Sequence, residues 1–195
     1  TMATSIPLSQ ITLPGHRAPG AGFEAPFEML DACHERVHRM LALLAKLQQH
    51  ARVHGWSQQI GQAAVDVMRY FDQAAPHHHE DEERHVFPPL LAGTDTALHT
   101  IVQRLQQDHR DMDAAWAQVR VVLAGVCQPP PAGWTDFTPE QTALINHFAS
   151  LYQRHIDDED GIVYPAAQAQ LAPDALLAMS EDMMRRRGVQ PLQGR

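Results

Sequence analysis

The sequence predicts an all-α protein: an up-down antiparallel four-helix bundle with an extended N-terminal arm and a short C-terminal fifth helix. Apolar residues recur at spacings of three, four and seven over long stretches, which is typical of amphipathic helices. No stretch shows the alternation of a strand. Short connections between four long helical stretches favour antiparallel neighbours. A chain of 195 residues can also bury a sizeable single core.

The N-terminal arm precedes the first two predicted helices. Residues 1–26 contain four prolines and three glycines, which exclude a helix there. The first helix is predicted from Phe27 to about Val53, before Gly55. Ser57 suits the N-cap of a second helix that extends to about Leu91. Pro76 is expected to kink this second helix or to split it in two.

The remaining helices have recognisable start signals. Thr94 or Asp95 can cap a third helix, which is predicted to reach about Ala124. The motif "TPEQ" at Thr138 predicts a capping box and starts a fourth helix that extends to about residue 171. "APDA" opens the fifth helix and "RRRG" closes it. The predicted divisions are an arm (1–26), the bundle with its fifth helix (27–187) and a tail (188–195).

Composition narrows the functional class. The net charge of −8 argues against a general nucleic-acid surface and against anionic membranes. Two cysteines, Cys33 and Cys127, provide neither a disulfide framework nor a thiolate cluster, which favours a reducing compartment. The sequence has no long apolar run and no signal-peptide pattern. We therefore expect a soluble cytoplasmic protein with no nucleic-acid or membrane partner.

An internal repeat singles out candidate metal ligands. "HHEDEERHVFP", which begins at His78, matches "HIDDEDGIVYP", which begins at His155, at an offset of 77 residues. The repeat retains a histidine and, four residues later, a glutamate, at Glu82 and Glu159. Residues four apart on a helix are separated by about 40° and share a face. Each pair therefore offers an imidazole and a carboxylate to one transition metal.

The other two long helices carry similar pairs. His34 is followed four residues later by His38, and His109 is followed four residues later by Asp113. The offset from His34 to His109 is 75, close to that of the first repeat. A pseudo-two-fold arrangement of the halves would bring four histidines and two glutamates together in the core of the bundle.

The run of histidines beside His78 has a less specific interpretation. Alone, this charged segment could be a solvated acidic face, and a single histidine on a helix is commonly a surface or packing residue. The repeat retains none of His77, His79 and His85. We expect His77 and His85 to lie outside the site. His79, about 100° from His78 around the helix, is expected to support the site or to lie at the surface.

These motifs, in this order and spacing, resemble the hemerythrin-like (HHE cation-binding) family from residue 27 to about residue 170. The resemblance implies a bundle that holds a non-haem di-iron centre. Zinc or another divalent metal also suits imidazole donors. The implied terminal imidazole ligands are His34, His78, His109 and His155, and the implied bridging carboxylates are Glu82 and Glu159.

Two features depart from the oxygen-carrying members of that family. Those members have a fifth histidine one turn after the third-helix ligand, where this sequence has Asp113. His38 could restore the count of five, and Asp113 is either an additional anionic ligand or a solvated helix acid. Those members also place the last carboxylate five residues after its histidine, whereas Glu159 is four residues after His155.

The resemblance implies binding of dioxygen or a related small oxidant for sensing, storage or detoxification. One alternative is a di-iron enzyme acting on peroxide or nitric oxide. Another alternative is a regulatory or metal-buffering module.

Overall fold

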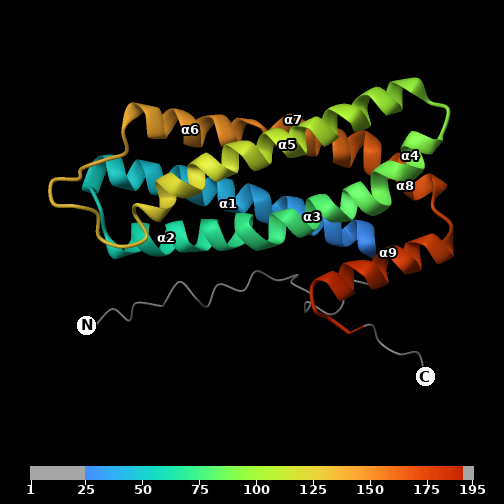
Figure 1. The fold of residues 1–195 in the computed structure, drawn as a ribbon, viewed down its shortest axis with the longest axis horizontal. Coiled ribbons are helices and arrows are strands. Elements are labelled where there is room, and N and C mark those ends of the chain that lie inside the picture. The colour runs from blue at the N-terminus through green and yellow to red at the C-terminus, as the bar shows by residue number, and fades with distance from the viewer. Residues whose placement is uncertain (1–24, 191–195) are drawn as a thin grey trace, which may run out of the picture.

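A computed structural model describes residues 25–190, and every regular element in that range is a helix. The predicted all-α class is therefore confirmed. Most of the predicted N-terminal arm and the end of the predicted tail lie outside the described residues. Figure 1 shows the long helical stretches side by side, with successive stretches running in opposite directions. Among the described residues, no helix combines the length and apolar character that crossing a membrane requires.

The first long stretch is a single helix, α1 (Pro26–His54). Gly55 follows it with φ 69°, and its N–H donates to the carbonyl of Ala51 at 2.8 Å. The second stretch begins after Ser57, whose hydroxyl accepts from the N–H of Ile60 as predicted. This stretch comprises α2 (Gln58–Arg69), η2 (Tyr70–Ala74), α3 (Ala75–Asp81), η3 (Glu82–Val86) and α4 (Phe87–Ala92).

The third and fourth stretches have the predicted caps. Asp95 accepts from the N–H of Leu98 and starts α5 (Thr96–Ala124). The predicted capping box between Thr138 and Gln141 is present in full. It starts a stretch that is interrupted for one residue and comprises α6 (Pro139–Ser150), α7 (Tyr152–Asp158), η4 (Glu159–Val163) and α8 (Tyr164–Gln170).

Three π-helical turns distinguish the second and fourth stretches from regular α-helices. Each turn ends two residues before a proline, at Pro76, Pro88 and Pro165. A proline has no N–H and its ring clashes with the carbonyl four residues earlier, so an α-helix cannot accommodate it without adjustment. A π-turn hydrogen-bonds five residues back and provides that adjustment. The predicted split at Pro76 therefore does not occur, and the helix continues through it.

Two apolar clusters form the core, with a polar layer between them. On α1, Leu30 belongs to one cluster and Val37 to the other, with His34 between them. On α5, Leu105 and Met112 flank His109 in the same way. Buried polar groups are stable only when they are paired or bind a ligand. The layer between the clusters is therefore where a functional site is expected.

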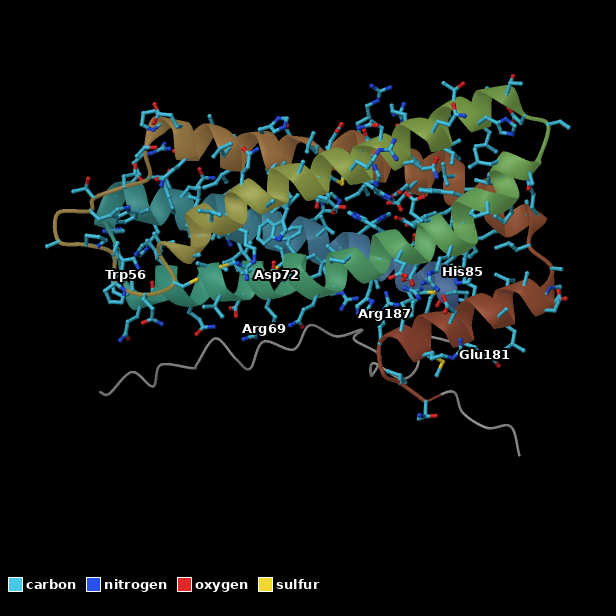
Figure 2. The ribbon with its side chains drawn as sticks, viewed as in Figure 1. Trp56, Arg69, Asp72, His85, Glu181 and Arg187 are labelled. Atoms are coloured by element: carbon cyan, nitrogen blue, oxygen red, sulfur yellow. The ribbon has the colours of Figure 1, made fainter. Side chains whose placement is uncertain are left out.

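The C-terminal helix α9 (Pro173–Arg186) packs against the cluster that contains Leu30. Its Met179 and Met183 are fully buried there. Arg187, just beyond the helix, donates to Asp81 on α3 at 2.6 Å, and Arg186 pairs with the same carboxylate. Figure 2 shows Arg187 beside the second stretch. The predicted fifth helix is thus attached to the bundle by both apolar and ionic contacts.

Candidate metal centre

Six of the eight predicted ligands meet in the polar layer. The histidines come from α1, α3, α5 and α7, and the two glutamates are the first residues of η3 and η4. All are at least 96% buried: His34 (3% exposed), His78 (3%), His109 (4%), His155 (2%), Glu82 (0%) and Glu159 (0%).

The donor atoms form two overlapping groups. The first position consists of His34, His78 and the two glutamates, and the second position consists of His109, His155 and the same two glutamates. Within each group, one donor atom from every residue lies within 4.8 Å of all the others. Both carboxylates belong to both groups, so the site can hold two ions that share them.

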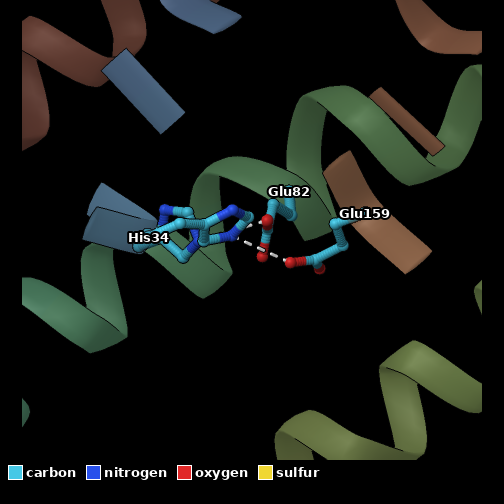
Figure 3. Close-up of side chains that lie close together, drawn as sticks. His34, Glu82 and Glu159 are labelled. Carbon is cyan, nitrogen blue, oxygen red and sulfur yellow. Dashed lines mark hydrogen bonds and ion pairs between the residues drawn. The ribbon is translucent and has the colours of Figure 1, made fainter. Parts of the chain in front are cut away.

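The carboxylate oxygens are divided between the two positions. Oε1 of Glu82 lies 3.2 Å from Nε2 of His78, and Oε2 lies 3.2 Å from Nε2 of His109. Figure 3 shows His34 pointing toward both carboxylates. Oε2 of Glu159 lies 3.0 Å from Nε2 of His34, whereas Oε1 lies 2.9 Å from Nε2 of His155. Each glutamate therefore has one oxygen for each position, as a bridging ligand requires.

Several of these buried atoms make ion-pair contacts with one another but no hydrogen bond of good geometry among the described residues. They are Glu82 Oε2, both Glu159 oxygens, His109 Nε2 and His155 Nε2. A native protein leaves few buried polar atoms without a partner, because each one costs free energy. A cation between the imidazoles and the carboxylates would satisfy them together. The donor set of nitrogen and carboxylate oxygen also matches what a first-row transition metal prefers.

Three of the four imidazoles have a carboxylate behind them, which means that it contacts Nδ1, the ring nitrogen that does not face the other donor atoms. Nδ1 of His34 lies 2.7 Å from Asp160, and Nδ1 of His109 lies 2.9 Å from Glu83. Nδ1 of His155 lies 3.2 Å from Asp108. Such a pair fixes the ring orientation and leaves Nε2 free for a metal, an arrangement typical of metal-binding histidines.

The fourth imidazole has a thiol behind it instead of a carboxylate. Nδ1 of His78 makes no hydrogen bond of good geometry among the described residues, and the nearby Cys33 thiol interacts with His78. Arg36 donates to the Cys33 sulfur at 3.1 Å. Burial raises the pKa of Cys33, but His78 and Arg36 outweigh it and lower the pKa to about 7.

The metal-free centre carries protons on its imidazoles. Burial lowers the pKa of His34, but the nearby carboxylates of Asp160 and Glu159 outweigh burial and raise the pKa to about 9. The pKa of His109 is raised to about 9 by Glu82 and Glu83 in the same way, against the effect of burial. A metal must displace these protons, because it binds neutral imidazole.

Aromatic rings cover both sides of the centre. Tyr164 stacks on His34 with centroids 5.4 Å apart, and Phe87 stacks on His109 at 5.6 Å. The Tyr164 hydroxyl donates to Oε1 of Glu82 and lies 3.2 Å from Nε2 of His34. Each ring is five residues after a bridging glutamate. A π-turn takes up one extra residue, so it brings a side chain at that spacing back to the glutamate's face.

The structure does not bring His38 or Asp113 into either group of donor atoms. Both residues are exposed on their helices. The buried positions beside them are occupied by Val37 and Met112. The buried apolar stripe of each helix therefore includes Val37 or Met112. His38 and Asp113, each one residue later, face solvent as a result.

The other histidines of the second stretch lie outside the two groups. His85 pairs with Asp182 of α9 at 2.7 Å, and it is labelled in Figure 2. The carbonyl of His77 accepts from Arg186. His79 stacks on His109 with centroids 4.0 Å apart. Burial and the charge on His109 lower the pKa of His79 well below its usual value, so this ring is neutral.

The sequence interpretation missed the residues behind the ligands. Glu83 and Asp160 are acids at the same repeat offset of 77, so the repeat contained a signal for them. Asp160 is also the acid five residues after His155, and it holds His34. The hydroxyl of Tyr164 had no such signal, because its repeat partner is Phe87.

Comparison with known proteins agrees with this geometry. The model of the hemerythrin HHE cation-binding domain matches residues 25–167. An uncharacterized protein from Haemophilus influenzae is 30% identical over 174 residues, which cover 87% of this chain and 94% of that protein. The matched segment contains both groups of donor atoms, and the chain therefore belongs to the hemerythrin HHE cation-binding family.

Proposed function

We propose that this protein binds two iron ions in its polar layer, and that the iron pair binds dioxygen or a related small oxidant for sensing, storage or detoxification. The observation that carries this proposal is the division of each buried carboxylate between the two histidine pairs. Membership of the cation-binding family supports it. We assign the four long stretches to an up-down antiparallel bundle of the hemerythrin kind, supported by their alternating directions (Figure 1).

Iron is the metal that best fits this proposal. Imidazole with carboxylate suits iron, although zinc and other divalent ions accept the same donors. Neither group of donor atoms includes a thiolate. A bound iron pair would supply electrons to the oxidant. The two cysteines of the sequence are free thiols, which supports a cytoplasmic setting.

The residues around the pair would control access and protons. The four imidazoles would hold the ions, and Glu82 and Glu159 would bridge them. The apolar clusters on either side exclude water, which strengthens electrostatic interactions at the centre. The Tyr164 hydroxyl keeps its proton at neutral pH, because burial and the two glutamates raise its pKa well above the usual value.

The Tyr164 hydroxyl also favours a second candidate, an enzyme that reduces peroxide or nitric oxide. Such a reaction needs hydrogen-bond donors and protons at the bound oxidant, and this hydroxyl is a buried hydrogen-bond donor at the centre. It contacts both Glu82 and His34, so a small oxidant at the first position would lie near it.

One set of measurements separates these functions. The protein would be reconstituted anaerobically with Fe(II), analysed for metal and then exposed to oxygen, peroxide or nitric oxide. An absorption change with oxygen that reverses under vacuum supports a carrier or sensor. Consumption of peroxide or nitric oxide that continues only while an electron donor is supplied supports the enzyme. Two irons without a response to any oxidant would leave a metal-buffering module and refute the proposed oxidant binding.

A further inference from the structure

The centre is built from two halves that match residue by residue. The offsets of 75 and 77 relate His34 to His109 and His78 to His155. They also relate the acids behind the rings: Asp160 holds His34 as Glu83 holds His109. Any mismatch between the halves therefore makes one metal position different from the other.

The first mismatch lies behind His78. Asp108, one residue before His109, lies 3.2 Å from Nδ1 of His155. The matching residue before His34 is Cys33, which interacts with His78 but provides no carboxylate. A carboxylate behind an imidazole raises its basicity and orients it for the metal. The first position has one such pair and the second position has two.

The second mismatch is a single hydroxyl. Phe87 and Tyr164 match at the offset of 77 and stack on His109 and His34 respectively. The Tyr164 hydroxyl donates to Oε1 of Glu82, the oxygen that faces His78. A donated hydrogen bond draws electron density from that oxygen and makes it a weaker metal ligand. Oε2, which faces His109, receives no hydrogen bond among the described residues.

The third mismatch concerns the residues next to Glu83 and Asp160, the acids that contact Nδ1 of His109 and His34. Gln106 donates to Glu83 at 2.9 Å and so braces the acid behind His109. At the offset of 75 the matching residue is Asp31, a carboxylate near Asp160. Asp31 has no side-chain amide to donate to Asp160. The first two mismatches therefore weaken the support of the first position.

We propose that the centre holds its two ions unequally, with the ion between His34 and His78 bound about 10- to 100-fold more weakly than the ion between His109 and His155. This inference rests on the proposed two-metal function. Cys33 and Tyr164 are its positioning residues, because they act through His78 and Glu82.

The inequality can be tested in variants that keep only one of the two metal positions. In such variants, repulsion between two bound ions does not affect the measured affinity. His155→Ala leaves the first position, and His78→Ala leaves the second. Co(II) would be titrated into each variant against a competing chelator, with circular dichroism to verify the fold. We expect His78→Ala to bind its ion about 10- to 100-fold more tightly than His155→Ala does. Equal affinities, or the reverse order, would overturn the proposal.

Exchanges at the mismatched positions test its cause. In the His155→Ala protein, Cys33→Asp should tighten Co(II) binding about 10- to 100-fold, while Cys33→Ser should leave it unchanged. Tyr164→Phe should also tighten binding, and a loss of affinity would instead show that its oxygen is a ligand and overturn the assignment. Asp108→Cys in the His78→Ala protein should weaken binding to the level of the first position.

If an alanine variant does not fold, the same exchanges can be made in the parent protein, which keeps all four histidines. Cys33→Asp should bring the two Co(II) binding steps closer together, and unchanged steps would contradict the role of Cys33. A parent protein that binds no pair of ions would refute the proposed function. A parent that binds two ions, with no effect of these exchanges, would refute only the inequality.

Discussion

Replacing Glu159 by glutamine removes one bridging carboxylate and keeps its volume. Glu159 is fully buried, with one oxygen 3.0 Å from His34 and the other 2.9 Å from His155. A glutamine offers an oxygen to one ion and an NH2 group to the other, so it cannot bridge. We expect the Glu159→Gln protein to bind one ion instead of two.

The loss of that ion should reduce metal-dependent stability by a predictable amount. At a metal concentration 100 times the dissociation constant of the weaker ion, that ion stabilises the folded state by about 2.7 kcal/mol, and an ion bound 10-fold more tightly contributes about 4.1 kcal/mol. Glu159→Gln should lose one of these two contributions. In a chain of 195 residues this loss corresponds to a Tm lower by about 5 to 16 °C.

A smaller loss is expected without metal. The pKa of His34 is raised to about 9, against a usual value of 6.5. At pH 7.5 such a shift contributes about 2 kcal/mol to stability, and this contribution is shared between Asp160 and Glu159. The Asp160 bond remains in the variant, so the metal-free protein should lose about 1 kcal/mol.

Thermal unfolding with and without Zn(II), combined with metal analysis, measures both quantities. Glu35→Gln is the matched control, because Glu35 is an exposed glutamate next to His34. If Glu159→Gln still binds two ions and gains as much stability from them as the parent does, Glu159 is not a bridge and the assignment of its two oxygens is refuted.

Three further results are expected. His38→Ala and Asp113→Asn should leave metal stoichiometry unchanged, because both residues are exposed and outside the donor groups; loss of an ion in either variant would restore the sequence-based assignment. Phe148 lies in the apolar cluster that contains Val37, and its ring is fully buried, so Phe148→Ala should lower the free energy of unfolding by about 3 to 5 kcal/mol in urea titration; a loss below about 1 kcal/mol would contradict its place in that core. The stabilising contribution of His34 and His109 in the metal-free protein is complete below pH 6.5 and is lost as pH rises through about 9, so its Tm with chelator present should fall over that range; a Tm that rises there would contradict the sign.

The repeat at an offset of 77 was sufficient to predict which histidine and glutamate lie together on one helix face, because their spacing is a property of one helix. His78 with Glu82, and His155 with Glu159, face the centre as the helical period requires. The same period does not place His38 at the centre, because spacing alone does not distinguish the buried stripe of a helix from its exposed border.

The π-turns were not predicted, although each precedes a proline. Proline predicted a kink or split at Pro76, whereas the helix continues with one extra residue in the turn. That extra residue brings Tyr164 to the centre. The residues behind the imidazoles depend on contacts between helices: Asp108 on α5 holds His155 on α7. A single-helix pattern contains no information about such pairs.

The metal content of the anaerobically reconstituted protein tests the central claim most directly. We predict two iron ions per chain, falling to one or none when Glu82 or Glu159 is replaced, because both carboxylates serve both positions. A folded parent protein that binds no more than one ion under these conditions would contradict the account.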